Sequence, residues 1–466
     1  MSTTTYGSFP GVRAEVVGGG VNGVIVGEEQ KIVIFGRGDN SGEDSAAYNE
    51  PTPINTRVDA NVKFGAGTEL SHAISGALRN GANTEYLYGV MPEEVVVDPA
   101  ELVAGGSGQL SNQPIVEDKS VITVNDVSGT TPEEQDVKFV YETPPPASTT
   151  DGECNVNPIT AEVDLGESSD IEVNYNYLDW ETALDAADSV VSFNETGLYC
   201  TVSESDIVTG LLSDKLNELR PNYKLIRGAA PAQPNATSDD GDALVDVSAY
   251  ADTHDNDALF VSAPTRLFEK EPLTLIGGVG GLLAGHELTN PVYGDRIRGY
   301  DRLDQQLSRS EEQTLRDAKV IPIRDDGAYG DGGIYLNDNL STSELTNWVR
   351  DYHRRRIVDQ VLLIGREIGE QAKNQRLTDS LLKFTEQVML DEIEELIEAG
   401  LLEGDAGTDG DTGGQTDDED EQPYYVDVSR DGTDTIAIAI GFTPIGIAKR
   451  IDETIVVSDS GATVSS

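Results

Sequence analysis

Three glycines near the start of the chain have the spacing of a dinucleotide-binding loop. Gly18, Gly20 and Gly23 satisfy the pattern G-x-G-x-x-G directly after a possible strand. The phosphate-binding form of this loop needs a helix that begins at the third glycine, and the following residues, VIVGEEQ, do not favour one. We interpret these glycines as a flexible or bulged strand connection. A second group, GGVGG at residues 277–281, opens an apolar helix and predicts close packing of that helix against a sheet.

The residue types that most often perform catalysis or bind metals do not form a recognisable site. The four histidines are His72, His254, His286 and His353. They lack the HxH or HxxxH spacing of a zinc site, and Cys154 and Cys200 are too few and too distant in sequence for one. No G-x-S-x-G nucleophile elbow occurs. We therefore predict that the protein is not an enzyme and holds no cofactor and no metal.

Charge is the most informative property of the composition. The chain of 466 residues carries 84 acidic and 32 basic residues, a net charge of -52 spread along its length. Such self-repulsion opposes compaction in ordinary salt, whereas molar salt shortens the screening length to about 3 Å. The charge predicts a halophilic protein in a high-salt environment. It argues against direct nucleic-acid binding, which needs clustered basic residues.

The one dense basic cluster is expected to have a structural or interface role. It consists of Arg354, Arg355 and Arg356, beside His353 in a predicted helix. No apolar run reaches the roughly 18 residues of a membrane span, and the N-terminus lacks the regions of a signal peptide. These features predict no membrane span, and a protein made in a cytoplasm or assembled there into something larger.

The first part of the chain has the pattern of an arm followed by an α/β layer. Residues 1–30 form the predicted N-terminal arm, with weak alternation at 12–17. The first part of the α/β core, 31–91, contains an apolar strand at 31–35, a helix at 69–80 and a second strand at 84–90. Strand, helix and strand in this order predict a layered α/β structure.

The pattern of predicted strands and helices then changes twice along the sequence. Residues 92–176 contain short strands separated by Gly, Pro, Ser and Asp clusters, with no evident helix. This pattern predicts a small β domain that is inserted into the core. Strands and helices alternate again in 177–403, which ends in two long helices. Capping boxes at Ser308 with Glu311 and at Ser341 with Glu344 predict helix starts, the second being the start of the first long helix. The fold class predicted for the whole is a three-layer α/β core with this insertion and with extended N- and C-terminal strand arms.

The C-terminal part consists of a predicted acidic flexible linker, 404–422, and a strand segment with an arm, 423–466. The linker is too poor in apolar residues to fold and does not match an EF-hand loop. In the stretch 436–442, isoleucines alternate with small residues, which predicts a half-buried strand. A second short apolar stretch lies at 454–457. Strands this apolar must join a sheet, either in their own chain or in another subunit.

Four segments, in this order, resemble the contractile tail sheath proteins of tailed viruses and related injection systems. They read SFPGVRAEVV with KIVIFGRG; LSHAISGALRNGANTEYLYGV; GGVGGLLAGHELTNPVYGDRI with LDQQLSRSEEQTLRDAKVIPIR; and YHRRRIVDQVLLIGREI with the final helix and IAIAIGFTPIGIAKRIDETIVV. The resemblance covers most of the chain outside 92–176, a region where the family carries variable β insertions on the outer surface. The acidic linker and Val320-Ile321-Pro322, where the family has an Asn-Pro pattern, depart from it.

The resemblance implies a mechanism as well as a fold. It implies a core of subtilisin-like topology without a protease triad. It also implies six-fold rings of identical subunits, stacked helically around an inner tail tube protein and bounded by baseplate and tail terminator proteins. The sheath would contract to drive the tube through the host envelope for DNA ejection. The protein would assemble in the host cytoplasm and belong to a virion tail, from a tailed virus of a halophilic archaeon or a related contractile injection system.

In this family the terminal arms of neighbouring subunits add strands to one another's sheets, a form of β-augmentation. The residues expected in inter-subunit arms are Val12, Arg13, Ala14, Glu15, Val16 and Val17 near the start, and Thr454, Ile455, Val456 and Val457 near the end. We expect 436–442 to complete the subunit's own core and 454–457 to cross to a neighbour. The alternatives are another self-assembling virion or surface structural protein without contraction, and a halophilic α/β enzyme.

Overall fold

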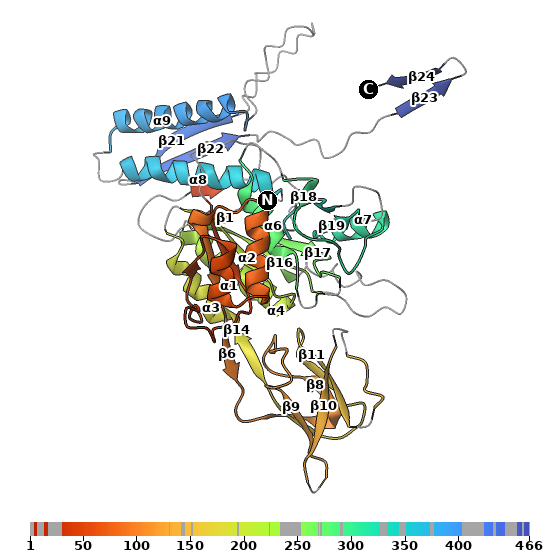
Figure 1. The fold of residues 1–466 in the computed structure, drawn as a ribbon. Helices are drawn as coiled ribbons and strands as arrows, with labels where there is room; N and C mark the ends of the chain where they lie inside the picture. Colours follow the sequence, from red (N-terminus) through yellow and green to blue (C-terminus); the bar gives the residue numbers. More distant parts are fainter. Residues whose placement is uncertain are drawn as a thin grey trace.

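The computed structural model describes most of the chain. The described residues are 30–129, 131–140, 145–150, 152–192, 195–222, 224–233, 253–268, 270, 273–288, 292–326, 333–343, 351–372, 377–402, 424–431 and 435–442, together with the backbone of four short terminal strands. The fold is mixed α/β, with several separate sheets (Figure 1).

The largest sheet has nine strands in the order β18-β20-β19-β17-β16-β15-β3-β5-β4. Its parallel strands are β3 (Lys31–Phe35), β5 (Leu87–Val90), β15 (Thr196–Thr201), β16 (Leu225–Pro231), β17 (Leu259–Ala263) and β19 (Ile321–Asp325). Two strands run antiparallel to these, β4 (Thr52–Pro53) and β20 (Ile334–Leu336), and the edge strand β18 (Asp295–Ile297) pairs antiparallel with β20. The central strands are continuous apolar runs because both faces of a parallel sheet are covered.

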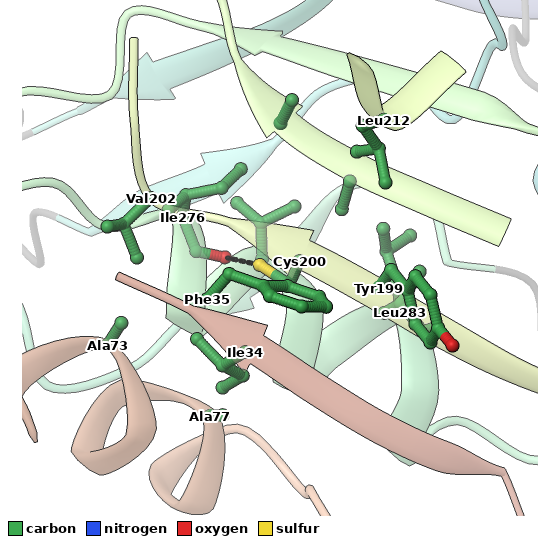
Figure 2. Packing of buried hydrophobic residues seen from close by; sticks show 14 of the residues in the cluster. Ile34, Phe35, Ala73, Ala77, Tyr199, Cys200, Val202, Leu212, Ile276 and Leu283 are labelled. Carbon is green, nitrogen blue, oxygen red and sulfur yellow. Dashed lines mark hydrogen bonds between the residues drawn. The ribbon is translucent and has the colours of Figure 1, made fainter. Parts of the chain in front are cut away.

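Helices cover both faces of the nine-stranded sheet. Cys200 of β15 points to α6 (Ile276–Gly285), where its thiol lies 3.6 Å from the carbonyl oxygen of Ile276 (Figure 2). Its neighbour Tyr199 is paired with Gly228 of β16, and Gly228 faces the leucines of α4 (Asp206–Leu219). Because side chains alternate along a strand, α6 and α4 lie on opposite faces. Helix α2 (Glu69–Arg79) packs beside α6, and α3 (Trp180–Ala186) beside α4.

The glycine-rich stretch of α6 serves close packing, as the sequence predicts, but its tightest partner is a helix rather than the sheet. A Cβ atom on Gly277 would overlap the carbonyl oxygen of Ala73, and one on Gly281 would overlap that of Ala77, both on α2. Gly280 faces Cys200 of the sheet at a looser distance. The absence of side chains therefore lets the two helix backbones approach each other directly.

A second sheet has seven short strands and its own apolar cluster. Its order is β7-β13-β9-β10-β11-β12-β8, with β7 (Glu101–Val103), β8 (Ser107–Gln109), β9 (Thr123–Asp126), β10 (Glu133–Phe139), β11 (Glu153–Asn157), β12 (Glu162–Asp164) and β13 (Ile171–Asn174). Val124, Val156 and Val173 are among its buried residues. The antiparallel pair β6 (Glu93–Val96) and β14 (Asn176–Asp179) leads into and out of this region. The short strands predicted here are present.

Two helices and a hairpin form a further group at the C-terminal end of the described core. They are α8 (Tyr352–Ala372), α9 (Asp379–Glu398), β21 (Tyr424–Asp431) and β22 (Thr435–Phe442). The helix start predicted at Ser341 is wrong, because Thr342 and Ser343 are not helical and α8 begins only at Tyr352. Glu344, the other half of the predicted capping box, lies outside the described residues. Its actual cap is Asp351, whose carboxylate accepts hydrogen bonds from the backbone N–H groups of His353 and Arg354.

The remaining helices lie at the margins of the nine-stranded sheet. Helix α1 (Arg57–Phe64) packs against α2, and α7 (Arg309–Asp317) packs against β19. Helix α7 starts with the predicted capping box, in which Ser308 and Glu311 bond to each other's backbone. The predicted strand at 84–90 is shorter than expected, since a 3-10 turn at Thr84–Tyr86 precedes β5.

Candidate assembly interface

The hairpin of β21 and β22 is a two-stranded sheet with one covered face. Its strands pair antiparallel along eight residue pairs, from Tyr424 with Phe442 to Asp431 with Thr435. Val426, Ile438 and Ile440 pack against the apolar side of α8 and α9, whereas Tyr425 is 59% exposed. Within the described residues, neither strand has a ladder partner on its outer edge. Unpaired edges present backbone donors and acceptors to which a further strand can bind.

The predicted strand at 436–442 is confirmed as part of the chain's own fold. The sheet that it joins is this hairpin and not the nine-stranded sheet. Its partner β21 was not predicted as a separate strand. Val426 and Val428 alternate with Asp427 and Ser429, and an Asp-Gly pair follows at 431–432. Alternation ending in Asp-Gly is the typical pattern of a hairpin and would have identified β21.

The predicted N-terminal arm lies at this hairpin. Ala14, Glu15 and Val16 form β2 (Ala14–Val16), which pairs antiparallel with β1 (Thr4–Tyr6). Strand β2 also contacts α8 and β22 of the same chain. Val12, Arg13 and Val17 lie outside the described residues. The structure therefore brings the central part of this arm to the hairpin without giving it a ladder partner there.

The predicted C-terminal arm is a strand as well. Thr454, Ile455, Val456 and Val457 belong to β23 (Thr454–Ser458), which pairs with β24 (Gly461–Ser465) of the same chain. Figure 1 shows this pair apart from the other labelled elements. Strand β24 was not predicted, although an Asp-Ser-Gly turn sequence at 459–461 separates two short β-forming stretches. The two predicted arms thus lie at different places on the molecule.

The basic cluster on α8 is structural. Arg355 and Arg356 are each 1% exposed, and Asp359, one turn later, is completely buried. Asp359 accepts a hydrogen bond of 2.7 Å from Arg220, and its carboxylate lies 3.2 Å from the guanidinium of Arg355. Arg227 of β16 lies 4.0 Å away.

The same cluster joins α8 to the core. Arg355 also forms an ion pair with Asp257, which precedes β17. We call Arg220, Arg227, Asp257, Arg355 and Asp359 the α8 charge cluster. Arg220 follows α4, Arg227 lies on β16, and Asp257 precedes β17, whereas the other two members lie on α8. The cluster therefore ties the C-terminal helices to the nine-stranded sheet.

The predicted candidates for chemistry are dispersed in the structure. His254 lies 2.7 Å from Asp206, His286 lies 3.5 Å from Asp295, and His72 packs against the ring of Tyr300. Among the described residues, no three metal-ligating side chains converge. Cys154 and Cys200 are buried free thiols, and burial raises the pKa of each to about 12. The glycines at 18, 20 and 23 lie outside the described residues. In the described part, no helix is long and apolar enough to cross a membrane.

One pocket with several charged lining residues was not predicted from the sequence. It lies beyond the carboxyl ends of β3 and β15, a cavity of about 70 Å³. Its charged lining residues are Arg37, Glu69, Glu117, Glu204 and Arg266. We call it the joint pocket, because residues 114–117 and 158–159 from the region of the seven-stranded sheet form its other wall. These five residues are far apart in sequence, and no local pattern connects them.

Solved structures of sheath proteins are similar to this chain. The contracted helical sheath of the anti-feeding prophage matches with a TM-score of 0.55 and 14% identity, over 96% of this chain and 98% of that chain. A chain in the six-fold symmetrised baseplate of the same particle matches with a TM-score of 0.53, 14% identity and the same coverage. A sheath tail protein of Listeria innocua matches with a TM-score of 0.49 and 11% identity, over 90% and 96% of the two chains. The match to the contracted sheath shows that the chain has the fold of a contractile sheath protein.

Sequence comparison adds nothing to this fold relationship. Neither a protein-family model nor a curated protein matches the sequence. At 14% identity, the relationship rests on the arrangement of the elements over nearly the whole chain.

Proposed function

We propose that this chain is the structural subunit of a contractile tail sheath. The observation that carries the proposal is the likeness of fold over 96% of the chain to a helical sheath solved in its contracted state. Identical subunits would stack as six-fold rings around an inner tail tube. Contraction would drive that tube through a host envelope, as a rigid-body change between two packings.

The proposed bond between subunits is strand exchange at the β21–β22 hairpin. The hairpin has outer edges without a ladder partner among the described residues, and two terminal strand pairs carry the predicted arms. An arm that adds to such an edge forms directional main-chain hydrogen bonds. The C-terminal arm lies apart from the hairpin of its own chain, so its contact with a neighbour's hairpin is heterologous and propagates into rings or helices. We propose that residues 12–17 and 454–457 are these arms.

We also propose the finer division of the chain. The core would have the subtilisin-like topology of the family, supported by parallel strands with helices on both faces. Residues 92–176 would be an inserted β domain on the outer surface, supported by their own sheet and apolar cluster and by the two-stranded entry formed by β6 and β14. Residues 404–422 would be a flexible acidic linker. The part played by the chain would be mechanical and not catalytic.

The remaining partners follow from the proposed role. A sheath subunit meets copies of itself, the tube inside, and baseplate and terminator proteins at the two ends. The particle would be a virion tail or a related injection device that assembles in the host cytoplasm, and the net charge of -52 supports a high-salt environment.

The test is assembly of the purified chain in molar salt, observed by negative-stain electron microscopy and sedimentation. We expect striated tubes from the native chain. Deletion of 454–466 and the substitution Val456→Pro should abolish them, because proline removes a ladder donor and fits poorly within a strand. Val456→Thr is the matched control, since it keeps a β-branched side chain in the strand.

Circular dichroism should show that all of these variants keep a folded core. Normal tubes from the deletion variant would refute strand exchange by the C-terminal arm. Monomers of the native chain at every salt concentration would refute the sheath proposal itself. Tubes of one fixed length and width, with no shorter and wider form after treatment with mild denaturant, would favour a structural protein that does not contract.

A further inference from the structure

The joint pocket lies where the parallel strand order reverses. From β3 the chain continues to β5, its neighbour on one side. From β15, the neighbour of β3 on the other side, the chain continues to β16, away from β3. The direction in which strands are added therefore reverses between β3 and β15. In open α/β sheets, a crevice forms outside the carboxyl ends of the strands at such a switch point. Here Arg37 follows β3, and Glu204 follows β15.

The other wall of the pocket belongs to the region of the seven-stranded sheet. In residues 114–117, the N–H of Ile115 donates to Pro158 at 2.9 Å and that of Val116 to Asn176 at 2.8 Å. Val116 is 1% exposed and packs into the main core. A hydrogen bond of 3.4 Å connects the two walls of the pocket, from the guanidinium of Arg37 to the carbonyl oxygen of Glu117. The pocket is therefore at a contact between the two sheets.

The charges around the pocket are unequal. Glu204 is held by Arg266, with 2.5 Å between Oε2 and Nε, and Thr265 donates a hydrogen bond to its other oxygen at 3.2 Å. The second guanidinium, that of Arg37, lines the same pocket as the carboxylates of Glu69 and Glu117. The lining thus contains three carboxylates and two guanidinium groups, and full ionisation would leave an excess of negative charge in a half-closed space.

Glu69 is the group whose ionisation this excess opposes. It is the first residue of α2 and half-buried. Burial raises the pKa of Glu69 to about 7, the charges of Glu117 and Glu204 act in the same direction, and Arg37 opposes them. One turn later on the same helix, burial lowers the pKa of His72, and nearby Lys270 and Arg79 lower it further. His72 therefore gives no compensating positive charge near neutral pH.

We propose that the joint pocket is a proton-operated contact. With Glu69 protonated, residues 114–117 pack closed against the core, and with Glu69 ionised the surplus negative charge loosens this contact. The proton is the ligand, and the position of the seven-stranded sheet on the core is what it controls. The inference concerns the single chain and holds whether or not the chain forms a sheath.

The direction of the effect follows from linkage. In the open form, Glu69 is hydrated and titrates near its ordinary value of 4.5, whereas in the closed form it titrates near 7. The closed form therefore binds the proton more tightly. The equilibrium constant for closure is highest below pH 4.5. It falls by up to about tenfold per pH unit as the pH rises to 7, and it levels off above pH 7.

Trp180 provides the readout. It lines the pocket and is 2% exposed. With the second tryptophan removed by Trp348→Phe, acrylamide quenching of fluorescence measures access to the pocket in the full chain at constant molar salt. We expect quenching to rise between pH 4.5 and 7 and to level off above 7. Glu69→Gln should remove this rise, while Glu134→Gln, which removes an exposed carboxylate on β10, should leave it unchanged.

A second variant makes the test independent of the first. Glu117→Gln removes a charge that raises the pKa of Glu69, so quenching should level off at a lower pH. An unchanged pH profile in folded Glu69→Gln would overturn the proposal, as would quenching that does not change between pH 4.5 and 8 in the native sequence. If Glu69→Gln fails to fold, a profile in Glu117→Gln that is unshifted or shifted upward would overturn it as well.

Discussion

Substitution of Asp359 tests whether the α8 charge cluster holds the C-terminal helices on the core. Asp359 is completely buried and lies within 4.0 Å of three guanidinium groups, those of Arg220, Arg227 and Arg355. A pair of unit charges about 4 Å apart interacts by ~4 kcal/mol at an effective dielectric constant of about 20. Asp359→Asn keeps the shape and removes the charge, so the arginines remain buried with one carboxylate fewer. Loss of one partner from a buried ion pair destabilises by about 3–5 kcal/mol.

The assay is thermal and urea unfolding in molar salt, combined with limited proteolysis of the region between α9 and the hairpin. Asp379→Asn is the matched control, because Asp379 is an aspartate on α9 that pairs with Arg430 at 3.7 Å and is 95% exposed. Exposed pairs of this kind contribute little, and salt screens them. We expect Asp359→Asn to lower stability far more than Asp379→Asn, and salt between 1 and 3 M to leave that difference nearly constant.

The opposite result has a clear meaning. If Asp359→Asn is no less stable than Asp379→Asn, the ion pairs of the cluster do not hold α8 to the core. Apolar contacts such as those of Ile357 and Val358, both fully or almost fully buried, would then account for the attachment. A difference that disappears in 3 M salt would show that the cluster is accessible to solvent in solution.

Two further predictions concern buried groups. Gly281→Ala should destabilise the chain by about 1–3 kcal/mol in urea unfolding, since its methyl group would overlap a carbonyl oxygen of α2. Gly129→Ala has only ordinary contacts there and serves as its control, so equal effects of the two would contradict the close approach of α2 and α6. Cys154 and Cys200 should resist alkylation by iodoacetamide at pH 8 in the folded chain, because burial holds both thiols protonated. Rapid labelling without unfolding would show that these sites open.

Local patterns predicted the elements whose reasons for forming are local. The run Lys31–Phe35 is apolar because it is a central strand covered on both faces, and the alternation at 436–442 matches a strand with one covered face. The capping box of Ser308 and Glu311 satisfies the helix end within four residues. In these cases the neighbours that decide the structure are close in sequence.

Patterns were misleading where a longer-range partner decides the structure. Ser341 begins a sequence that resembles a helix cap, yet it is buried, and α8 starts at Tyr352, directly after Asp351, whose carboxylate bonds to the first turn. The prediction that the glycines at 277–281 allow close packing is confirmed, but their tightest partner is α2, about 200 residues earlier in the chain, and not the sheet. Sequence spacing does not encode which surface will face a helix.

The joint pocket could not be predicted because its residues meet only after folding. Arg37, Glu69, Glu117, Glu204 and Arg266 lie on five separate segments of the chain. In a chain with 84 acidic residues, none of the three glutamates is distinctive by type. What distinguishes Glu69 is burial beside two other carboxylates, and burial of this kind depends on the strand order and on the position of the second sheet.

Salt should control assembly more strongly than it controls folding of the core. Several basic residues, among them Arg220, Arg227, Arg355 and Arg356, are buried and cannot lower the charge density of the surface. A strand that adds to the β21–β22 hairpin approaches to about 4.8 Å. The screening length is about 10 Å at 0.1 M salt and about 3 Å at 1 M, so repulsion acts across this distance only at the lower concentration.

The expected result is an assembly threshold between these two concentrations. Light scattering of the purified chain during a salt titration should rise steeply between 0.1 and 1 M, while circular dichroism changes much less. Potassium chloride and sodium chloride should act alike if screening is the cause, because the Debye length depends on ionic strength and not on the identity of the ion. Tubes that form equally well at 0.1 M would show that acidic surfaces do not oppose each other at the contact. The strand exchange would then have to occur between surfaces whose negative charge is too small to oppose it.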